Sequence, residues 1–173
     1  MEYLDLYLIH WPTKLSGETW KALEKLYKDG KVKAIGLCNF KEQHLKELML
    51  SAEIKPMVNQ IQLHPELTEE ALTEYCKKEK IQIVSWGPLE RGKIFNIPLL
   101  KELGEKYKKS IPQITLRWHL QKGYGAIPKS NKEERMKENF QIFDFNLTKE
   151  DIRLIDGLNK NERMSKVPVG TIF

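Results

Sequence analysis

The stretch YLDLYLIHWP at Tyr3–Pro12 shapes the prediction for the whole chain. Its apolar and aromatic residues, broken by one charge at Asp5, are typical of a parallel strand buried on both faces. The polar pair His10 and Trp11 follows, and Pro12 ends the strand because proline has no N–H to give to a sheet. Ligands of parallel sheets bind beyond the carboxyl ends of the strands, so His10 is a candidate site residue.

Length and composition describe an ordinary globular protein. The 173 residues suffice for one domain with a sizeable core, and 40% of them are hydrophobic. The net charge of +5 comes from lysines spread along predicted helices rather than from one basic block, which argues against nucleic-acid binding. With no signal peptide and no apolar run that could cross a bilayer, we expect no membrane association and a cytoplasmic location. Cys38 and Cys76 have no metal-ligand spacing, which favours a reducing compartment and leaves a disulfide as the alternative.

Strand-like and helix-like segments alternate along the chain. After the first strand, strands are predicted at 33–37, 57–62, 81–85 and 124–127, and helices at 18–28, 41–50, 68–78, 98–107, 111–123, around 135–139, and from 148 to 158. This alternation predicts an α/β fold with parallel strands, either an open doubly wound sheet or part of a (β/α) barrel. No G-x-G-x-x-G motif follows any strand, which disfavours the open sheet.

Taken together, the residues at the strand ends resemble the aldo-keto reductase family. The matching stretches follow in the family's order: DLYLIHWP at 5–12, IGLCNF at 35–40, VNQ at 58–60, WGPL at 86–89, and IPKS at 127–130 with Arg135, Glu138 and Asn139. The resemblance implies a (β/α)₈ TIM barrel that binds a nicotinamide cofactor at its C-terminal face without a dinucleotide fingerprint, in agreement with the missing glycine motif.

The resemblance also implies which part of the barrel is present. The chain starts at the family's fourth strand, so we expect a partial TIM barrel of strands four to eight, with an extra helix before the last-but-one barrel helix and a C-terminal helix. Residues 1–173 would form a single domain, the NADP-binding half, with the three N-terminal β/α units absent. The strands that begin and end this half would then be open edges, through which we expect self-association, whereas full-length members are mostly monomeric.

His10 and Trp11 match substrate-binding positions of the family. There His10 is the catalytic histidine, whose neutral imidazole N–H can bond to a carbonyl oxygen as negative charge develops on it. The alternative is a histidine that only satisfies its own strand end. Trp11 would line the substrate pocket, or else pack on the barrel rim.

Asn39 and Gln60 match positions that bind the nicotinamide carboxamide, a group that needs a donor and an acceptor. The alternative is a pair of buried amides that tie loops together. Cys38 stands where the family usually has serine, and a thiol is the poorer donor for this cofactor contact.

Trp86 matches the aromatic residue that stacks on the nicotinamide ring, with core packing as the alternative. Gly87, Pro88 and Leu89 follow it in the cofactor-binding segment. Gly87 also departs from a serine that is common in the family, which leaves the backbone N–H to contact the pyrophosphate.

Lys129, Ser130 and Asn131, with Arg135 on the following helix, match the segment that binds the adenosine 2′-phosphate. Two cations and a hydroxyl near a helix N-terminus suit a dianion, which favours NADP(H) over NAD(H). The alternative is a solvated basic helix face. Glu138 and Asn139 match positions that contact adenine.

The resemblance implies an NADPH-dependent oxidoreductase that reduces aldehydes or ketones to alcohols by hydride transfer. The family's catalytic Asp, Tyr and Lys match no position in this chain, so we expect the chain to be inactive alone. The alternative is a non-catalytic remnant or an NADP-binding regulatory module. No metal is implied, because His44, His64 and His119 have no partner at metal-ligand spacing and are interpreted as structural.

Overall fold

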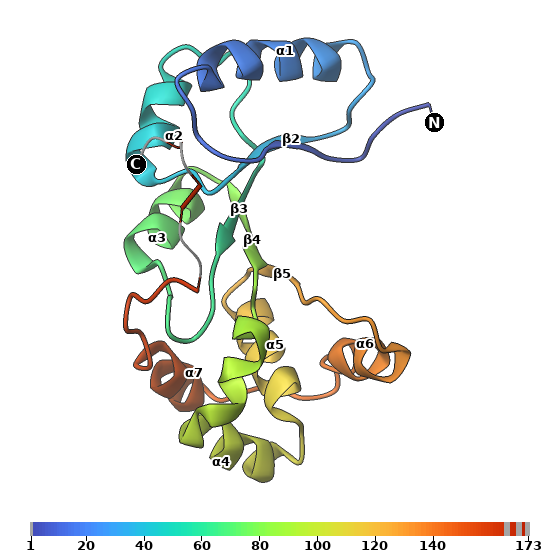
Figure 1. The fold of residues 1–173 in the computed structure, drawn as a ribbon, viewed down its shortest axis with the longest axis vertical. Helices are drawn as coiled ribbons and strands as arrows, with labels where there is room; N and C mark the ends of the chain where they lie inside the picture. The colour runs from blue at the N-terminus through green and yellow to red at the C-terminus, as the bar shows by residue number, and fades with distance from the viewer. Residues whose placement is uncertain (1, 165–166, 169–170, 172–173) are drawn as a thin grey trace. The chain divides into compact units, whose positions relative to one another are not determined.

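The computed structural model describes residues 2–164, 167–168 and 171, in which strands and helices alternate (Figure 1). Contacts divide the chain into two compact units. The first comprises the described residues of 1–61, 70–83 and 165–173, and the second comprises 62–69 and 84–164. Each unit is described in turn.

The first unit contains the strands β1 (Tyr7–Ile9), β2 (Ile35–Cys38) and β3 (Val58–Gln62). β1 and β3 pair with β2 in parallel, with Ile9 opposite Leu37 and Cys38 opposite Gln60. β2 forms the centre of this core, since Ile35 and Leu37 are fully buried. The helices of this unit are α1 (Ser16–Lys28), α2 (Glu42–Met49) and α3 (Glu70–Lys78).

Helix α1 packs through a buried aromatic and a buried carboxylate. Trp20 donates its indole N–H to the Ile54 carbonyl oxygen at 3.1 Å. Glu24 accepts hydrogen bonds from the backbone N–H groups of Glu53 and Ile54, at 2.8 and 2.9 Å. These bonds satisfy a carboxylate that would otherwise be costly to bury, and they fix the loop before β3.

The apolar pattern of Tyr3–Ile9 alone predicts burial on both faces, which is wrong, whereas the structure agrees with the open edge that the family resemblance implies. Tyr3 is 44% exposed and Tyr7 is 45% exposed, and the strand is limited to β1. Within the described residues of this unit, β1 pairs with β2 alone and is therefore an edge strand. Its apolar pattern fits a central strand, but burial requires a neighbour on each side.

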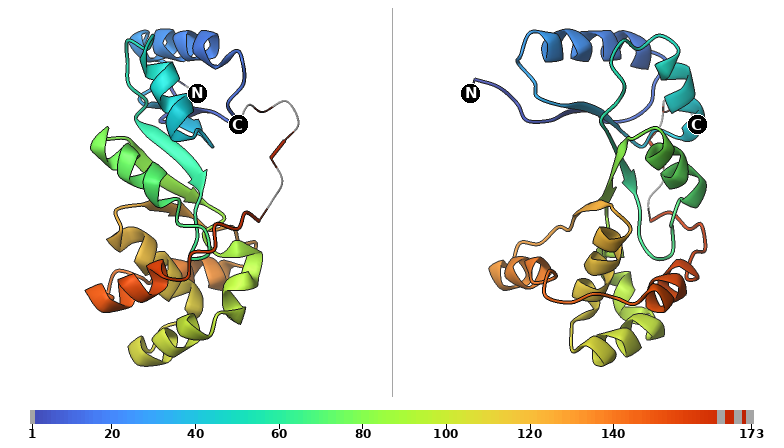
Figure 2. Two further views of the ribbon diagram at one scale, coloured as in Figure 1. Left: turned by 90° about the vertical axis from the view of Figure 1, so that its left-hand side faces the viewer. Right: turned by 180° about the vertical axis from the view of Figure 1, so that it is seen from behind.

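The second unit contains β5 (Gly125–Ile127) and, from Val84 onward, the parallel strand β4 (Gln82–Trp86), in which Trp86 lies opposite Ile127. Helix α6 follows β5 and lies on the opposite side of α5 from α7 (Figures 1 and 2). The helical elements are the 3₁₀ segment η1 (Glu90–Asn96), α4 (Pro98–Tyr107), α5 (Ile111–Gln121), α6 (Glu133–Phe140) and α7 (Lys149–Asp156).

Predicted helix starts are confirmed where capping residues are present. Ser110 and Gln113 form a reciprocal capping box at α5, and the Thr148 hydroxyl accepts the Asp151 N–H at α7. The predicted start of the third helix at Thr68 is wrong, because Glu69 has a φ of +47° and the helix begins at Glu70. Segment η1 was not predicted, and left-handed residues interrupt it.

His119 lies in the core of the second unit. Its Nδ1 is 2.8 Å from the Thr115 carbonyl oxygen and its Nε2 is 3.2 Å from that of Leu63. Burial lowers the pKa of His119 to about 4, so the imidazole is neutral at physiological pH. A neutral imidazole has a single N–H, so it donates to one of these two carbonyl oxygens. Its full burial in the core supports the structural interpretation.

Asp151 links α7 to α4. Its buried carboxylate accepts hydrogen bonds from Lys106 at 2.8 and 2.9 Å, from the Tyr107 hydroxyl, and from the Thr148 hydroxyl at 2.8 Å. Burial alone would raise the pKa of Asp151, but these donors outweigh it and hold the pKa below its ordinary value. The ionised carboxylate therefore stabilises the fold above about pH 4, and this contribution is lost as pH falls through the folded-state pKa.

We expect Asp151→Asn to lower the free energy of unfolding by about 1–3 kcal/mol at pH 7, because it weakens several charge-assisted bonds. The variant should also lose less stability than the unsubstituted protein as pH falls below about 4. Urea denaturation at several pH values measures both effects. The matched control is Glu150→Gln, because the Glu150 side chain is 71% exposed. This substitution should lower the free energy of unfolding by less than about 0.5 kcal/mol. Equal losses for both variants would contradict the assignment.

Candidate functional site

In the first unit, hydrogen bonds gather the predicted site residues at the carboxyl ends of the strands. Asn39 follows β2 with a φ of +63°, and its backbone N–H donates to the Gln60 carbonyl oxygen at 2.9 Å. Its side-chain Nδ2 donates to the His10 carbonyl oxygen at 3.1 Å. Asn39 therefore joins the ends of all three strands of this unit. His10, Cys38, Asn39 and Gln60 lie together here, as the sequence predicts.

His10 and Trp11 follow directly after β1. The His10 side chain is exposed, and its ring centroid is 6.0 Å from that of Trp11 with a tilt of 47°. An exposed imidazole whose backbone is held by Asn39 can donate a hydrogen bond to a carbonyl oxygen. This is the chemistry that the predicted role of His10 requires.

The turn after β2 has a buried anchor. Asn59 is fully buried and donates its Nδ2 to the Phe40 carbonyl oxygen at 2.9 Å. Cys38 is also buried, and burial raises the pKa of its thiol to about 11. The thiol therefore stays protonated at neutral pH. Cys38 and Cys76 are both free cysteines, so the disulfide alternative is not realised.

The second unit contains a cavity of about 700 Å³ at the carboxyl ends of β4 and β5. Every cofactor-binding residue that the sequence predicts in this unit lines it. These residues are Trp86, Gly87, Pro88 and Leu89 after β4, Lys129, Ser130 and Asn131 after β5, and Arg135, Glu138 and Asn139 on α6. The prediction missed further residues of the lining, among them Arg91, Gly92, Phe95, Ser110 and Met164.

The cavity carries an excess of positive charge. The cations Arg91, Lys129 and Arg135 line it with one carboxylate, Glu138. Within the part of the chain that the structure describes, none of these three cations forms an ion pair, whereas lysines elsewhere do, such as Lys122 with Asp156 at 2.9 Å. A half-open cavity with uncompensated cations is suited to an anionic ligand.

Ser130 has a local role that sequence analysis missed. Its hydroxyl accepts the Lys132 N–H at 3.1 Å and donates to the Lys132 carbonyl oxygen at 3.2 Å. The first turn of α6 carries Glu133 and Glu134, which already complement the positive end of the helix dipole. The cationic side chains, more than the helix N-terminus, would therefore attract an anion to this wall.

Gly87 is required by the backbone and by its surroundings. Its φ is +66°, a conformation that L-residues rarely adopt, and an added Cβ would lie 2.3 Å from the methyl group of Met164. A side chain at this position would therefore meet both backbone strain and a close contact.

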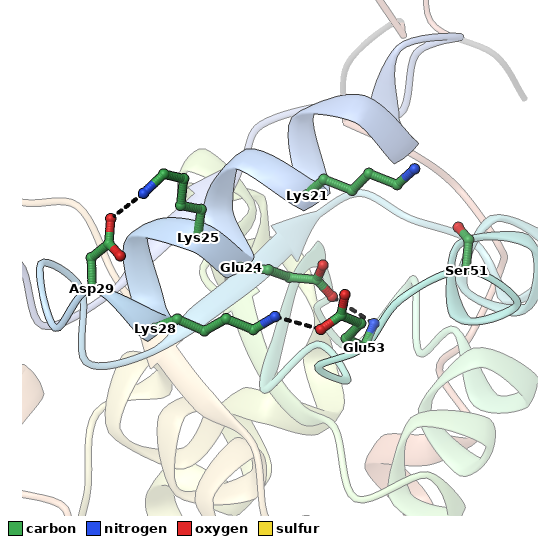
Figure 3. A pocket seen from close by; sticks show the side chains of 7 residues that line it. All are labelled: Lys21, Glu24, Lys25, Lys28, Asp29, Ser51 and Glu53. Carbon is green, nitrogen blue, oxygen red and sulfur yellow. Dashed lines mark hydrogen bonds and ion pairs between the residues drawn. The ribbon is translucent and has the colours of Figure 1, made fainter.

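A second hollow, of about 310 Å³, lies on α1 (Figure 3). Its lining has three lysines and three carboxylates, and four of these six side chains form ion pairs. Lys25 binds Asp29 at 2.7 Å, and Lys28 binds Glu53. Because these charges compensate one another, the hollow has little attraction for an anion. We interpret it as the place where α1 packs against the loop before β3.

Two other classes of site find no support in the described residues. No three of their His, Cys, Asp or Glu side chains are arranged to hold a metal ion. Every helix described is too short or too polar to span a bilayer.

Comparison with known proteins identifies the family. Residues 1–160 match the model of the aldo/keto reductase family. The chain belongs to the aldo/keto reductase family. It is 53% identical to glyoxal reductase of Bacillus subtilis (strain 168), an alignment that covers 100% of this chain and 63% of that protein. It is 39% identical to methylglyoxal reductase DkgA of Escherichia coli (strain K12), with 97% of this chain and 63% of that protein covered.

Solved structures agree with the partial-barrel prediction. MGS-M4, an aldo-keto reductase from a deep-sea metagenome library, matches with a TM-score of 0.94 at 38% identity, over 100% of this chain and 65% of its own. A mutant of Gox0644 in complex with NADPH matches with a TM-score of 0.93 at 40% identity, over 99% and 65%. The chain thus has an α/β fold whose five parallel strands match part of an aldo-keto reductase barrel, and it spans slightly under two thirds of its relatives' length.

We expect Gly87→Ala to lower the free energy of unfolding by more than the about 1–2 kcal/mol typical of a left-handed L-residue, because its Cβ also meets Met164. The matched control is Gly123→Ala, since Gly123 has a φ of +81° and open space around it. Urea denaturation of both variants separates backbone strain from the clash. The double variant Gly87→Ala/Met164→Ala should regain only the part of the stability that the clash removes, because the backbone strain at residue 87 remains. Equal losses for the two single variants would contradict a role for Met164.

Proposed function

We propose that this chain forms the NADP(H)-binding part of an oxidoreductase that reduces small aldehydes and ketones to alcohols. The observation that carries the proposal is the cationic cavity at the ends of β4 and β5, which is lined by all the cofactor-binding residues predicted in this unit. Its volume of about 700 Å³ lies in the range of small-molecule and cofactor sites.

The cavity lining provides contacts for the chemically different parts of the dinucleotide. Lys129 and Arg135 would bind the 2′-phosphate, where the guanidinium can form two parallel hydrogen bonds. Glu138 and Asn139 offer polar groups to adenine. Trp86 offers an aromatic face for the nicotinamide ring. A relative crystallised with NADPH at 40% identity supports the choice of cofactor.

The first unit would act on the reacting groups. Bound NADPH would supply the hydride. His10 would donate a hydrogen bond to the carbonyl oxygen and stabilise the negative charge that forms there. Asn39 and Gln60 would hold the carboxamide, and the bond from Asn39 to the His10 carbonyl oxygen would keep the imidazole in position. Glyoxal and methylglyoxal, named by two relatives, are the first substrates to test.

Protonation of the product oxygen needs a general acid. In the family a tyrosine has this role, and no tyrosine of this chain matches its motif. We therefore propose that the chain by itself binds the cofactor without turning over. Open edges at β1 and β5 would favour self-association of the isolated chain.

The full chain should bind NADPH and discriminate against NADH, because the 2′-phosphate provides charge-assisted bonds. Isothermal titration calorimetry measures both affinities. Arg135→Ala should weaken NADPH binding by about tenfold or more, the typical loss of a hydrogen bond to a charged group. The matched control is Lys137→Ala on the same helix, since Lys137 is exposed and pairs with Glu133 at 2.7 Å. Equal affinities for NADPH and NADH would contradict the proposed site.

The chain alone should not oxidise NADPH in the presence of methylglyoxal above the rate without protein. Absorbance at the NADPH maximum measures this directly. The control is the same chain shown by calorimetry to bind NADPH. An absence of NADPH oxidation then reflects the missing acid rather than missing cofactor. Turnover at a rate comparable with that of a full-length relative would overturn the claim that the acid is absent.

A further inference from the structure

Helix α6 forms one wall of the cationic cavity but contributes no side chain to the core. All eight of its residues are described, and none of them is buried. Its apolar side chains Met136 and Phe140 are both exposed. Segments without regular secondary structure precede and follow the helix, which lies at the periphery of the second unit (Figure 1). Burial of its own side chains therefore does not fix its position.

An apolar hollow lies between α6 and α5. It has a volume of about 250 Å³, and its lining includes Leu116 and Leu120 of α5 with Met136 and Phe140 of α6. Side chains that face an open hollow lack the close contacts that fix neighbouring helices in a packed core. The attachment of α6 must depend on another kind of interaction.

One buried amide provides that interaction. Gln113 lies in the first turn of α5, and its Nε2 donates to the carbonyl oxygens of Glu138 and Gln141, at 3.1 and 3.0 Å. These two residues are in the last turn and at the C-terminal cap of α6, where carbonyl groups lack the usual N–H partner four residues ahead. Among the described residues, no other side chain from outside α6 forms a hydrogen bond with the backbone of this helix.

The same amide also binds the start of its own helix. Its Oε1 accepts the backbone N–H of Ser110 at 3.0 Å, which is half of the capping box of α5. Both N–H groups and the oxygen of Gln113 are thus used, and they join the N-terminus of α5 to the C-terminus of α6. The sequence pattern Ser-x-x-Gln accounts for the oxygen alone, so the bridge to α6 is visible only in the structure.

Gln113 does not itself line the cavity, whereas Arg135, Glu138 and Asn139 of α6 all do. Residues three and four positions apart share one face of a helix, so these three side chains are placed by the turn that Gln113 holds. The guanidinium of Arg135 can form two parallel bonds to a phosphate only when it is correctly oriented.

We propose that Gln113 is a positioning residue for the adenosine 2′-phosphate end of the cofactor and thereby sets the preference for NADP(H) over NAD(H). Its amide holds the last turn of α6 in place before the ligand arrives, which avoids the cost of ordering Arg135, Glu138 and Asn139 on binding. This inference rests on the proposed cofactor. It adds a residue that touches no ligand and acts through α6.

Gln113→Glu tests this role, because it keeps the oxygen that accepts the Ser110 N–H and removes the N–H donors to α6. Calorimetry on the full chain should show that this variant binds NADP⁺ and adenosine 2′-monophosphate about tenfold more weakly, the typical loss of a hydrogen bond to a charged group. Its affinity for NAD⁺ should fall by less than about threefold, because NAD⁺ has no 2′-phosphate. The preference for NADP⁺ over NAD⁺ therefore decreases.

The matched control is Gln121→Glu on the same helix. The Gln121 amide also bridges α5 to a later segment, because its Nε2 donates to the Leu147 carbonyl oxygen at 3.0 Å and its Oε1 accepts the Leu147 N–H at 2.7 Å. Leu147 lies beyond α6, so this variant should keep all three affinities within about twofold. Should Gln113→Glu fail to fold, Gln113→Met and Gln121→Met take the place of this pair, since methionine has a similar length and no N–H donor.

A double-variant cycle tests whether Gln113 acts through α6. Arg135→Ala alone should weaken NADP⁺. Gln113→Glu/Arg135→Ala should then bind NADP⁺ only slightly more weakly than Arg135→Ala does, because the guanidinium that Gln113 positions is no longer present. Losses that add in full would overturn the positioning role.

The outcomes distinguish this inference from the proposed function. Failure of the unsubstituted chain to bind either NADP⁺ or adenosine 2′-monophosphate would overturn the cofactor itself. Unchanged binding of both ligands by Gln113→Glu would overturn the role of Gln113 alone. Equal weakening of NADP⁺ and NAD⁺ would also overturn it, because Gln113 would then only stabilise the fold.

Discussion

Hydrogen bonding between parallel strands is the constraint on which both halves of the candidate site depend. A parallel ladder brings the carboxyl ends of neighbouring strands to the same edge, so residues far apart in the chain become neighbours there. In the first unit Cys38 lies opposite Gln60, and in the second Trp86 lies opposite Ile127. The chemistry-bearing residues follow these pairs directly. The register of the strands therefore groups these residues, and side-chain contacts are not needed to bring them together.

The strand ends must then turn sharply, and this protein makes those turns with left-handed residues. Asn39, Gly87 and the segment from Glu90 to Gly92 all have positive φ values. Each conformation is supported by its surroundings: Asn59 binds the Phe40 carbonyl oxygen, and His64 contacts Glu90. Burying polar groups costs free energy. Here the buried polar groups stabilise backbone conformations that orient neighbouring residues toward the candidate site.

The two compact units divide the chemistry of the proposed reaction. The second unit contains the whole cationic cavity, so the residues proposed to bind the phosphates of a cofactor all lie within residues 86–164. The first unit contains His10 with the amides of Asn39 and Gln60, for which we propose contacts with the reacting groups. The chain spans slightly under two thirds of its relatives' length, and the whole cavity lies within that span.

Local signals in the sequence determined most elements and most of the site. Pro98 and the Ser110 capping box mark helix starts and apolar runs mark strands, because each of these is a short-range property. The roles of the polar residues after the strands were predicted from their resemblance to a family. Tertiary structure alone decided the rest. The exposure of Tyr3 and Tyr7 depends on which strands flank β1, a fact that no pattern within β1 contains. Likewise Arg91 and Lys93 are two neighbouring cations in the sequence, and only the fold shows that Arg91 lines the cavity and Lys93 does not, because this depends on the left-handed backbone at Arg91 and Gly92.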